Sequence, residues 1–221
     1  PKTNELTVSF SDNLPITLPD MLKNKYVFTI LERMRPVNFQ FIKGIERGKV
    51  CLDIGSINTI NTFDRTYILE FLQNVNLLLI NNSVTNALFS ILNVENLAEL
   101  YKILNLDLLI TTSGSGPATF VFASDNGVQI INKQPKIIDN AIDNTGAGDA
   151  FFSVIIKAYS KYVQTNKSID INFVNNVFDL ANTYAAEIVQ LLGSRGDKKT
   201  INSWIQSYKK HYKHEKDTLC L

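Results

Sequence analysis

The chain has 221 residues, of which 45% are hydrophobic, and its 22 Lys and Arg residues nearly balance 21 Asp and Glu residues, giving a formal net charge of +1. This balance excludes the broad positive surface that nucleic-acid or anionic-membrane binding requires, so we expect small-molecule partners, no nucleic acid and no membrane. Two cysteines cannot form a disulfide framework, and the N-terminal stretch "PKTNELTVSF" lacks a signal-peptide pattern. We therefore expect one globular, cytoplasmic domain over residues 1–221.

Four apolar runs in the first half of the chain are typical of strands that are buried on both faces. They cover residues 26–30, 49–55, 75–81 and 106–112. Segments with helical spacing of apolar residues lie between the later runs, over residues 62–75, 83–92 and 94–105. This β-α-β order predicts an α/β fold, in which a mostly parallel sheet has helices on both faces.

The second half of the chain begins with a predicted β-hairpin over residues 118–133. Its two β-rich arms flank Asn126-Gly127, which can supply the positive φ angles of a tight turn. Three helical stretches are expected after the hairpin, the first ending near Tyr162, the second over 173–192 and the third over 200–214.

The sequence "DNTGAGDA" precedes the first of these helices and places Gly146, Ala147 and Gly148 at its N-terminus. The first amides of a helix have no intrahelical partner and attract anions, and small side chains let a phosphate approach them. Asp149 follows directly, where a carboxylate can accept the proton of a hydroxyl that attacks the phosphate. From spacing alone, a tight loop with Asp149 as a first-turn charge is an equally good interpretation.

Residues 143–149 resemble the Asp-x-Thr-Gly-Ala-Gly-Asp signature of the ribokinase-like (PfkB) carbohydrate kinase family, and all fixed positions match. The resemblance implies a ribokinase-like fold, with Asp149 as the catalytic base. It also implies that the amides of Gly146, Ala147 and Gly148 form the anion hole for the transferred phosphoryl group. In members that use a monovalent cation, the residues matching Asp143 and Thr145 help to hold it.

The resemblance also implies ATP and Mg²⁺ as cofactors and a sugar or nucleoside-like alcohol as the acceptor. Thr112 and Gly114 resemble the Thr-x-Gly turn that lines the nucleotide phosphates and ribose, and Asn182 is expected near the adenine. Apolar residues around Asn182 offer an alternative for that segment, an amphipathic helix whose role is packing.

Three departures from the family pattern bear on activity. The family carries an Asn-x-x-Glu motif whose acid helps to place magnesium. Counted from Asn81 the acid position is Val84, and counted from Asn82 it is Thr85, so neither position carries a carboxylate. In the nucleotide turn, Pro117 stands where the second glycine is usual. No N-terminal segment resembles the sugar-binding lid, so we expect a chain that matches the C-terminal two-thirds of a family member, either truncated or without the acceptor site. Because family dimers usually form through that lid, its absence favours a monomer, and a homodimer is the alternative.

Three classes of function are compatible with an α/β chain that has a glycine turn. The leading hypothesis is an ATP-dependent kinase, and the alternative is a nucleotide-binding pseudokinase or regulatory module, which the missing acid near Val84 favours. A dinucleotide-dependent oxidoreductase is excluded, because the glycines come late in the chain and lack the G-x-G-x-x-G spacing after an early strand. Asp53, near the C-terminal end of the second apolar run, is either a further site residue or a turn residue.

Overall fold

The computed structural model describes residues 28–31, 34, 36–43, 45, 50–165, 168–191 and 206. The chain forms two compact units. The first comprises residues 1–114 and 119–131, and the second comprises residues 115–118 and 132–221. The expected helix over residues 200–214 lies outside the described residues, apart from Gln206, which is helical.

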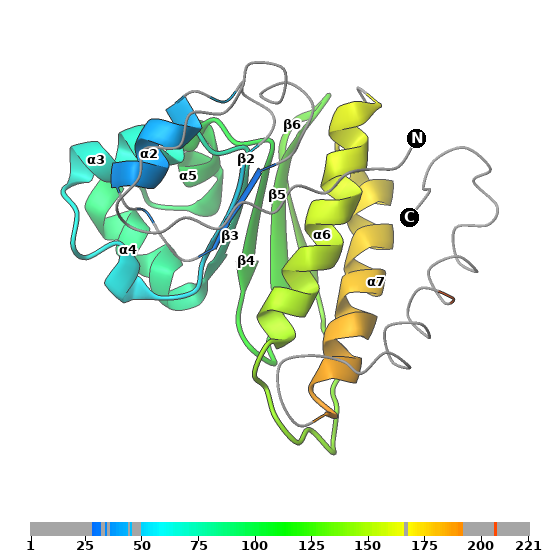
Figure 1. Cartoon of the computed structure of the whole chain (residues 1–221). Coiled ribbons are helices and arrows are strands. Elements are labelled where there is room, and N and C mark those ends of the chain that lie inside the picture. Colours follow the sequence, from blue (N-terminus) through cyan, green and yellow to red (C-terminus); the bar gives the residue numbers. More distant parts are fainter. Residues whose placement is uncertain are drawn as a thin grey trace. The chain divides into compact units, whose positions relative to one another are not determined.

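A six-stranded sheet follows the order of the strands along the chain. Four strands are parallel neighbours: β1 (Phe28–Leu31), β2 (Val50–Ile54), β3 (Leu77–Asn81) and β4 (Leu108–Thr112). The fifth strand, β5 (Ala118–Ser124), runs antiparallel to β4, and β6 (Gly127–Lys133) completes the sheet. The four predicted apolar runs therefore correspond to the parallel strands, and the helices of the first unit pack against the sheet (Figure 1).

Five short helices lie among the described residues of the first unit. They are α2 (Pro36–Lys43), the 3-10 turn η1 (Ile57–Thr59), α3 (Arg65–Leu72), α4 (Asn82–Leu92) and α5 (Leu97–Leu104). Side-chain caps fix where the last three begin, because Asp64, Asn81 and Asn96 each accept a hydrogen bond from a first-turn amide. Asn93 and Asn105 end α4 and α5 in the left-handed conformation, which asparagine tolerates better than most residues.

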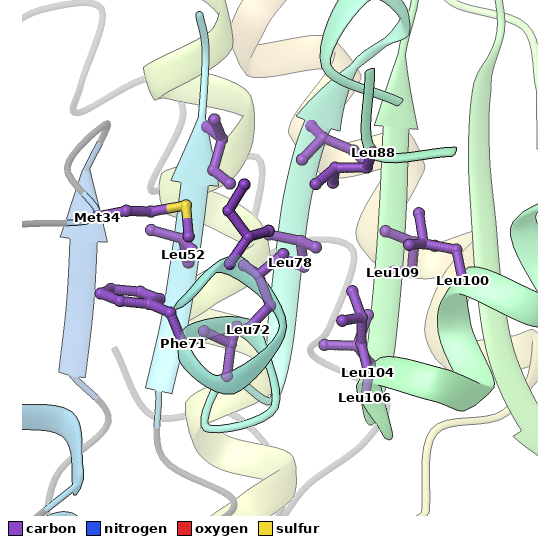
Figure 2. Close-up of a cluster of buried hydrophobic side chains, with 14 of the residues drawn as sticks. Met34, Leu52, Phe71, Leu72, Leu78, Leu88, Leu100, Leu104, Leu106 and Leu109 are labelled. Atoms are coloured by element: carbon purple, nitrogen blue, oxygen red, sulfur yellow. The ribbon is translucent and has the colours of Figure 1, made fainter. Parts of the chain in front are cut away.

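The core of the first unit lies between the sheet and α2 to α5. Alternate strand residues such as Leu52, Leu78 and Leu109 point toward these helices, where they pack with residues such as Phe71 and Leu104 (Figure 2). Consecutive parallel strands joined by right-handed connections place all their connecting helices on the same face of the sheet. The helices between β1 and β4 consequently cover the same face of the sheet (Figure 1).

The predicted hairpin is present as β5 and β6, with Asp125 and Asn126 between the strands. Gly127 has the positive φ angle, +104°, whereas Asn126 does not share it. The Ser124 hydroxyl accepts from the Asn126 amide and donates to the Gly127 carbonyl, so a side chain stabilises the turn. The expectation of positive φ angles was thus right for Gly127 and wrong for Asn126.

Two long antiparallel helices dominate the second unit, α6 (Ala147–Gln164) and α7 (Ile171–Ile188). Their apolar faces pack together through edge-on aromatic contacts, Phe151 with Phe178 and Tyr162 with Phe173. Asp170 caps α7 by accepting from the Phe173 amide at 2.7 Å. Among the described helices, none has both the length and the apolar character needed to cross a bilayer.

Candidate active site

The N-terminus of α6 is the central feature of the candidate site. Its N-cap is Gly146, with φ +80° and ψ 0°, and no side chain caps this end of the helix. A glycine N-cap has no side-chain oxygen, so no side chain caps the first-turn amides, although the Ala147 amide donates to the Asn144 carbonyl at 3.3 Å. Gly148 is exposed, and a Cβ atom added there would meet no atom within 4 Å. This end of α6 therefore has the geometry of an anion site.

Asp149 is the third residue of α6 and lies on its exposed first turn. The next three residues are buried, which fixes the helix beneath it, and Phe151 packs edge-on against Phe178 of α7. A carboxylate in the first turn is compatible with the positive end of the helix dipole. The structure thus places the carboxylate one residue beyond the glycine loop, on a rigid support.

The approach to the glycine loop is shaped by Asp143. One carboxylate oxygen, Oδ1, accepts from the Thr145 amide at 2.9 Å and closes a turn that leads directly to Gly146. The backbone amides of Ile142 and Asp143 both donate to the Val189 carbonyl just after α7, at 2.7 and 3.2 Å. Asp143 is half-buried and Thr145 is exposed.

Thr112 and Gly114 lie in the first unit, at the C-terminal edge of the parallel strands. Thr112 ends β4 and pairs in register with Asn81, which ends β3. The Asn81 side chain donates to the Gly55 carbonyl at 2.7 Å and caps α4 by accepting from the Val84 amide at 2.9 Å. Gly114 has φ +59°, which glycine adopts readily. In α/β sheets this edge is where ligands bind.

The position of the family acid is occupied by a core residue. Val84 is 0% exposed and packs in the core of the first unit. Thr85, the other candidate position, is also buried, and its hydroxyl donates to the Asn81 carbonyl at 2.9 Å. Among the described residues, no group of three or more His, Cys, Asp or Glu side chains could hold a metal ion.

Asn182 lies on α7 and is half-buried. Its side-chain oxygen, Oδ1, accepts from the backbone amide of Lys136 at 3.3 Å. The sequence suggested an adenine contact or a packing helix for this segment, and neither suggestion anticipated this hydrogen bond.

Glu187 was missed by the sequence analysis. Its Oε2 atom is buried and has no hydrogen-bond partner among the described residues. Burial raises the pKa of its carboxyl group above the ordinary value, and the nearby Lys136 ammonium opposes part of that rise. The available signal was a single acid inside the apolar run "YAAEIV".

Several solved structures of similar fold are kinases. A nucleoside kinase from Methanocaldococcus jannaschii is 18% identical with a TM-score of 0.56, covering 77% of this chain and 52% of its own. The Thermotoga maritima ribokinase is 19% identical with a TM-score of 0.59, covering 86% and 60%. A fructokinase with bound ATP from Xylella fastidiosa is 14% identical with a TM-score of 0.62, covering 86% and 64%. The chain thus spans between about half and two thirds of these structures.

The fold is therefore that of the ribokinase-like kinases. Residues 49–201, more than half of the chain, match the pfkB family of carbohydrate kinases. The chain belongs to this family. No curated protein matches it by sequence.

Proposed function

We propose that the protein transfers the γ-phosphoryl group of ATP to a hydroxyl group of a sugar or nucleoside-like small molecule. The observation that carries the proposal is the uncapped N-terminus of α6, where Gly146 opens the helix and Asp149 lies on the same first turn. Amides and carboxylate together supply the two groups that phosphoryl transfer requires, an anion hole and a base. Family membership and the kinase neighbours support the same reaction class.

In the proposed reaction the acceptor oxygen attacks the γ-phosphorus as the bond to the β–γ bridging oxygen breaks. ADP leaves with the bonding electron pair, and the hydroxyl proton passes to the Asp149 carboxylate. The amides of Gly146, Ala147 and Gly148 donate hydrogen bonds to the transferred group. Amides held by a helix need no reorganisation as charge develops, which is the source of their catalytic value.

Among the described residues, no group of three or more His, Cys, Asp or Glu side chains could hold magnesium, and Val84 occupies the position of the family acid. Mg²⁺ would arrive with the triphosphate and keep mostly phosphate and water ligands. Oxygen atoms of Asp143 and Thr145 are of the type that a monovalent cation prefers, and the loop that they form adjoins Gly146. A cation there would hold the loop, and dependence of ATP affinity on the supplied alkali ion would test it.

Asp149→Asn tests the proposed base. Because the anion hole is made of backbone amides, ATP binding should change little, whereas the phosphorylation rate should fall about 10²- to 10⁴-fold. Turnover across a panel of sugars and nucleosides is measured together with the ATP dissociation constant. Unchanged turnover in the folded variant would contradict the assignment.

The second candidate function is a nucleotide-binding pseudokinase, favoured by the core position of Val84. It predicts saturable ATP binding to the intact protein without phosphorylation of any acceptor in the panel.

A further inference from the structure

A strap, residues 133–143, connects β6 to the glycine loop and runs along α7. The Lys133 ammonium donates to the Asn175 side chain at 3.1 Å, the Lys136 amide donates to the Asn182 side chain at 3.3 Å, and the end of the strap donates to the Val189 carbonyl. These three acceptors follow one another at seven-residue intervals. Seven residues make about two helical turns, so the acceptors lie on one side of the helix.

Apolar burial holds the strap in place only in part. Ile137 is 79% exposed and Ile142 is 65% exposed, whereas Pro135 and Ile138 are half-buried. Since none of these apolar residues is fully buried, the hydrogen bonds to α7 add to what holds the strap.

The strap is connected directly to the candidate anion site. Its last residue, Asp143, holds the Thr145 amide through its carboxylate, and the left-handed Gly146 follows. The Ala147 amide donates to the Asn144 carbonyl at 3.3 Å within the same turn. A shift of the strap would therefore change the orientation of the amides that are proposed to bind phosphate.

We propose that Asn182 is a positioning residue, which anchors the strap by accepting from the Lys136 amide and so keeps the glycine loop in its anion-binding conformation. This inference rests on the proposed function for its ligand. This positioning role differs from the adenine contact expected from the sequence, because the side-chain oxygen of Asn182 accepts from a backbone amide of the protein and does not contact the adenine base.

The two roles are separated by comparing ATP with inorganic tripolyphosphate, which carries the phosphates without the base. Asn182→Leu removes the acceptor at similar side-chain size, and should weaken binding of both ligands by the same factor, about three- to tenfold for one lost hydrogen bond. Asn182→Asp keeps an acceptor oxygen and should restore both affinities. Weaker ATP binding with unchanged tripolyphosphate binding would overturn the proposal in favour of a base contact.

Hydrogen exchange of the ligand-free protein tests the anchor independently of nucleotide binding. Asn182→Leu should accelerate exchange at the amides of Lys136, Thr145 and Ala147, and Asn182→Asp should return it toward the wild-type rate. Faster exchange at Lys136 alone would overturn the proposal, because the strap would then not control the loop. If the wild type binds neither ligand, the proposed function fails, while the exchange rates still decide the role of Asn182.

The Asn182 variants must also be checked for any effect on the stability of α7. Leucine has a higher helix propensity than asparagine, so Asn182→Leu should not unwind α7, which circular dichroism can check. Should the leucine variant fail to fold, Asn182→Ala removes the same acceptor with a smaller side chain and takes its place in both measurements.

Discussion

Glycine suits positions 146 and 148 for two different reasons. The φ angle of Gly146 is +80°, which an L-residue adopts only at a cost, whereas Gly148 is helical and has no positive φ angle. A Cβ atom at position 148 would meet nothing within 4 Å in the protein. Conformation therefore explains Gly146, and the proposed phosphate offers an explanation for Gly148.

Gly148→Ala should separate folding from ligand binding. Alanine is a better helix residue than glycine, so the ligand-free variant should be more stable by up to about 1 kcal/mol. Its Cβ would project into the space proposed for the phosphate, so ATP should bind at least several-fold more weakly. Chemical denaturation and calorimetric titration measure the two effects. A variant that binds ATP as tightly as the wild type would contradict a phosphate at this position.

In α4, a buried packing residue, Val84, stands where the family motif has an acid. The Asn81 cap fixes the start of the helix, and that start directs the side chain of Val84 into the core. The helix therefore begins where the family motif begins, but the position of the acid is used for packing. An acid at position 84 would therefore have to lie in the apolar core of the first unit.

Val84→Glu should not restore a kinase-like acid, even though it recreates the motif. A buried carboxylate must lose its hydration or take up a proton, and we expect the variant to lose roughly 2–5 kcal/mol of stability. The pKa of a buried glutamate rises, so this loss should grow as the pH increases through that raised value and be smaller in acid. Urea denaturation at several pH values measures it.

Ser83→Glu is the matched control, because Ser83 is exposed and lies on the first turn of the same helix. An acid there faces water and complements the helix dipole, so its effect on stability should be small and favourable. Equal destabilisation by Ser83→Glu and Val84→Glu would show that burial of Val84 is not the cause.

For the whole molecule, the sequence predicted the parallel strands well because buried strands appear as continuous apolar runs. The place of the glycine loop at the start of α6 was predictable for a different reason, because residues 143–149 match a fixed seven-residue signature. The Lys136–Asn182 hydrogen bond was not predictable, because any residue at position 136 other than proline offers the same backbone amide. The assignment of buried residues to one compact unit or the other was not predictable either, since periodicity reports that a residue is buried but not which residues surround it.

ATP should stabilise the intact protein in a saturable manner, because a ligand that binds only the native state raises the free energy of unfolding. At a concentration 100 times the dissociation constant the gain is about 2.7 kcal/mol, which corresponds to a rise in Tm of roughly 5–10 °C for a chain of this size. Gly148→Ala is the matched control, and should require much more ATP for the same shift. A thermal titration that stays flat up to millimolar ATP in the wild type would eliminate the kinase and the nucleotide-binding pseudokinase together. A saturable shift without phosphorylation of any acceptor would instead favour the pseudokinase, because nucleotide binding does not need the proposed base, whereas turnover needs the Asp149 carboxylate and an acceptor as well.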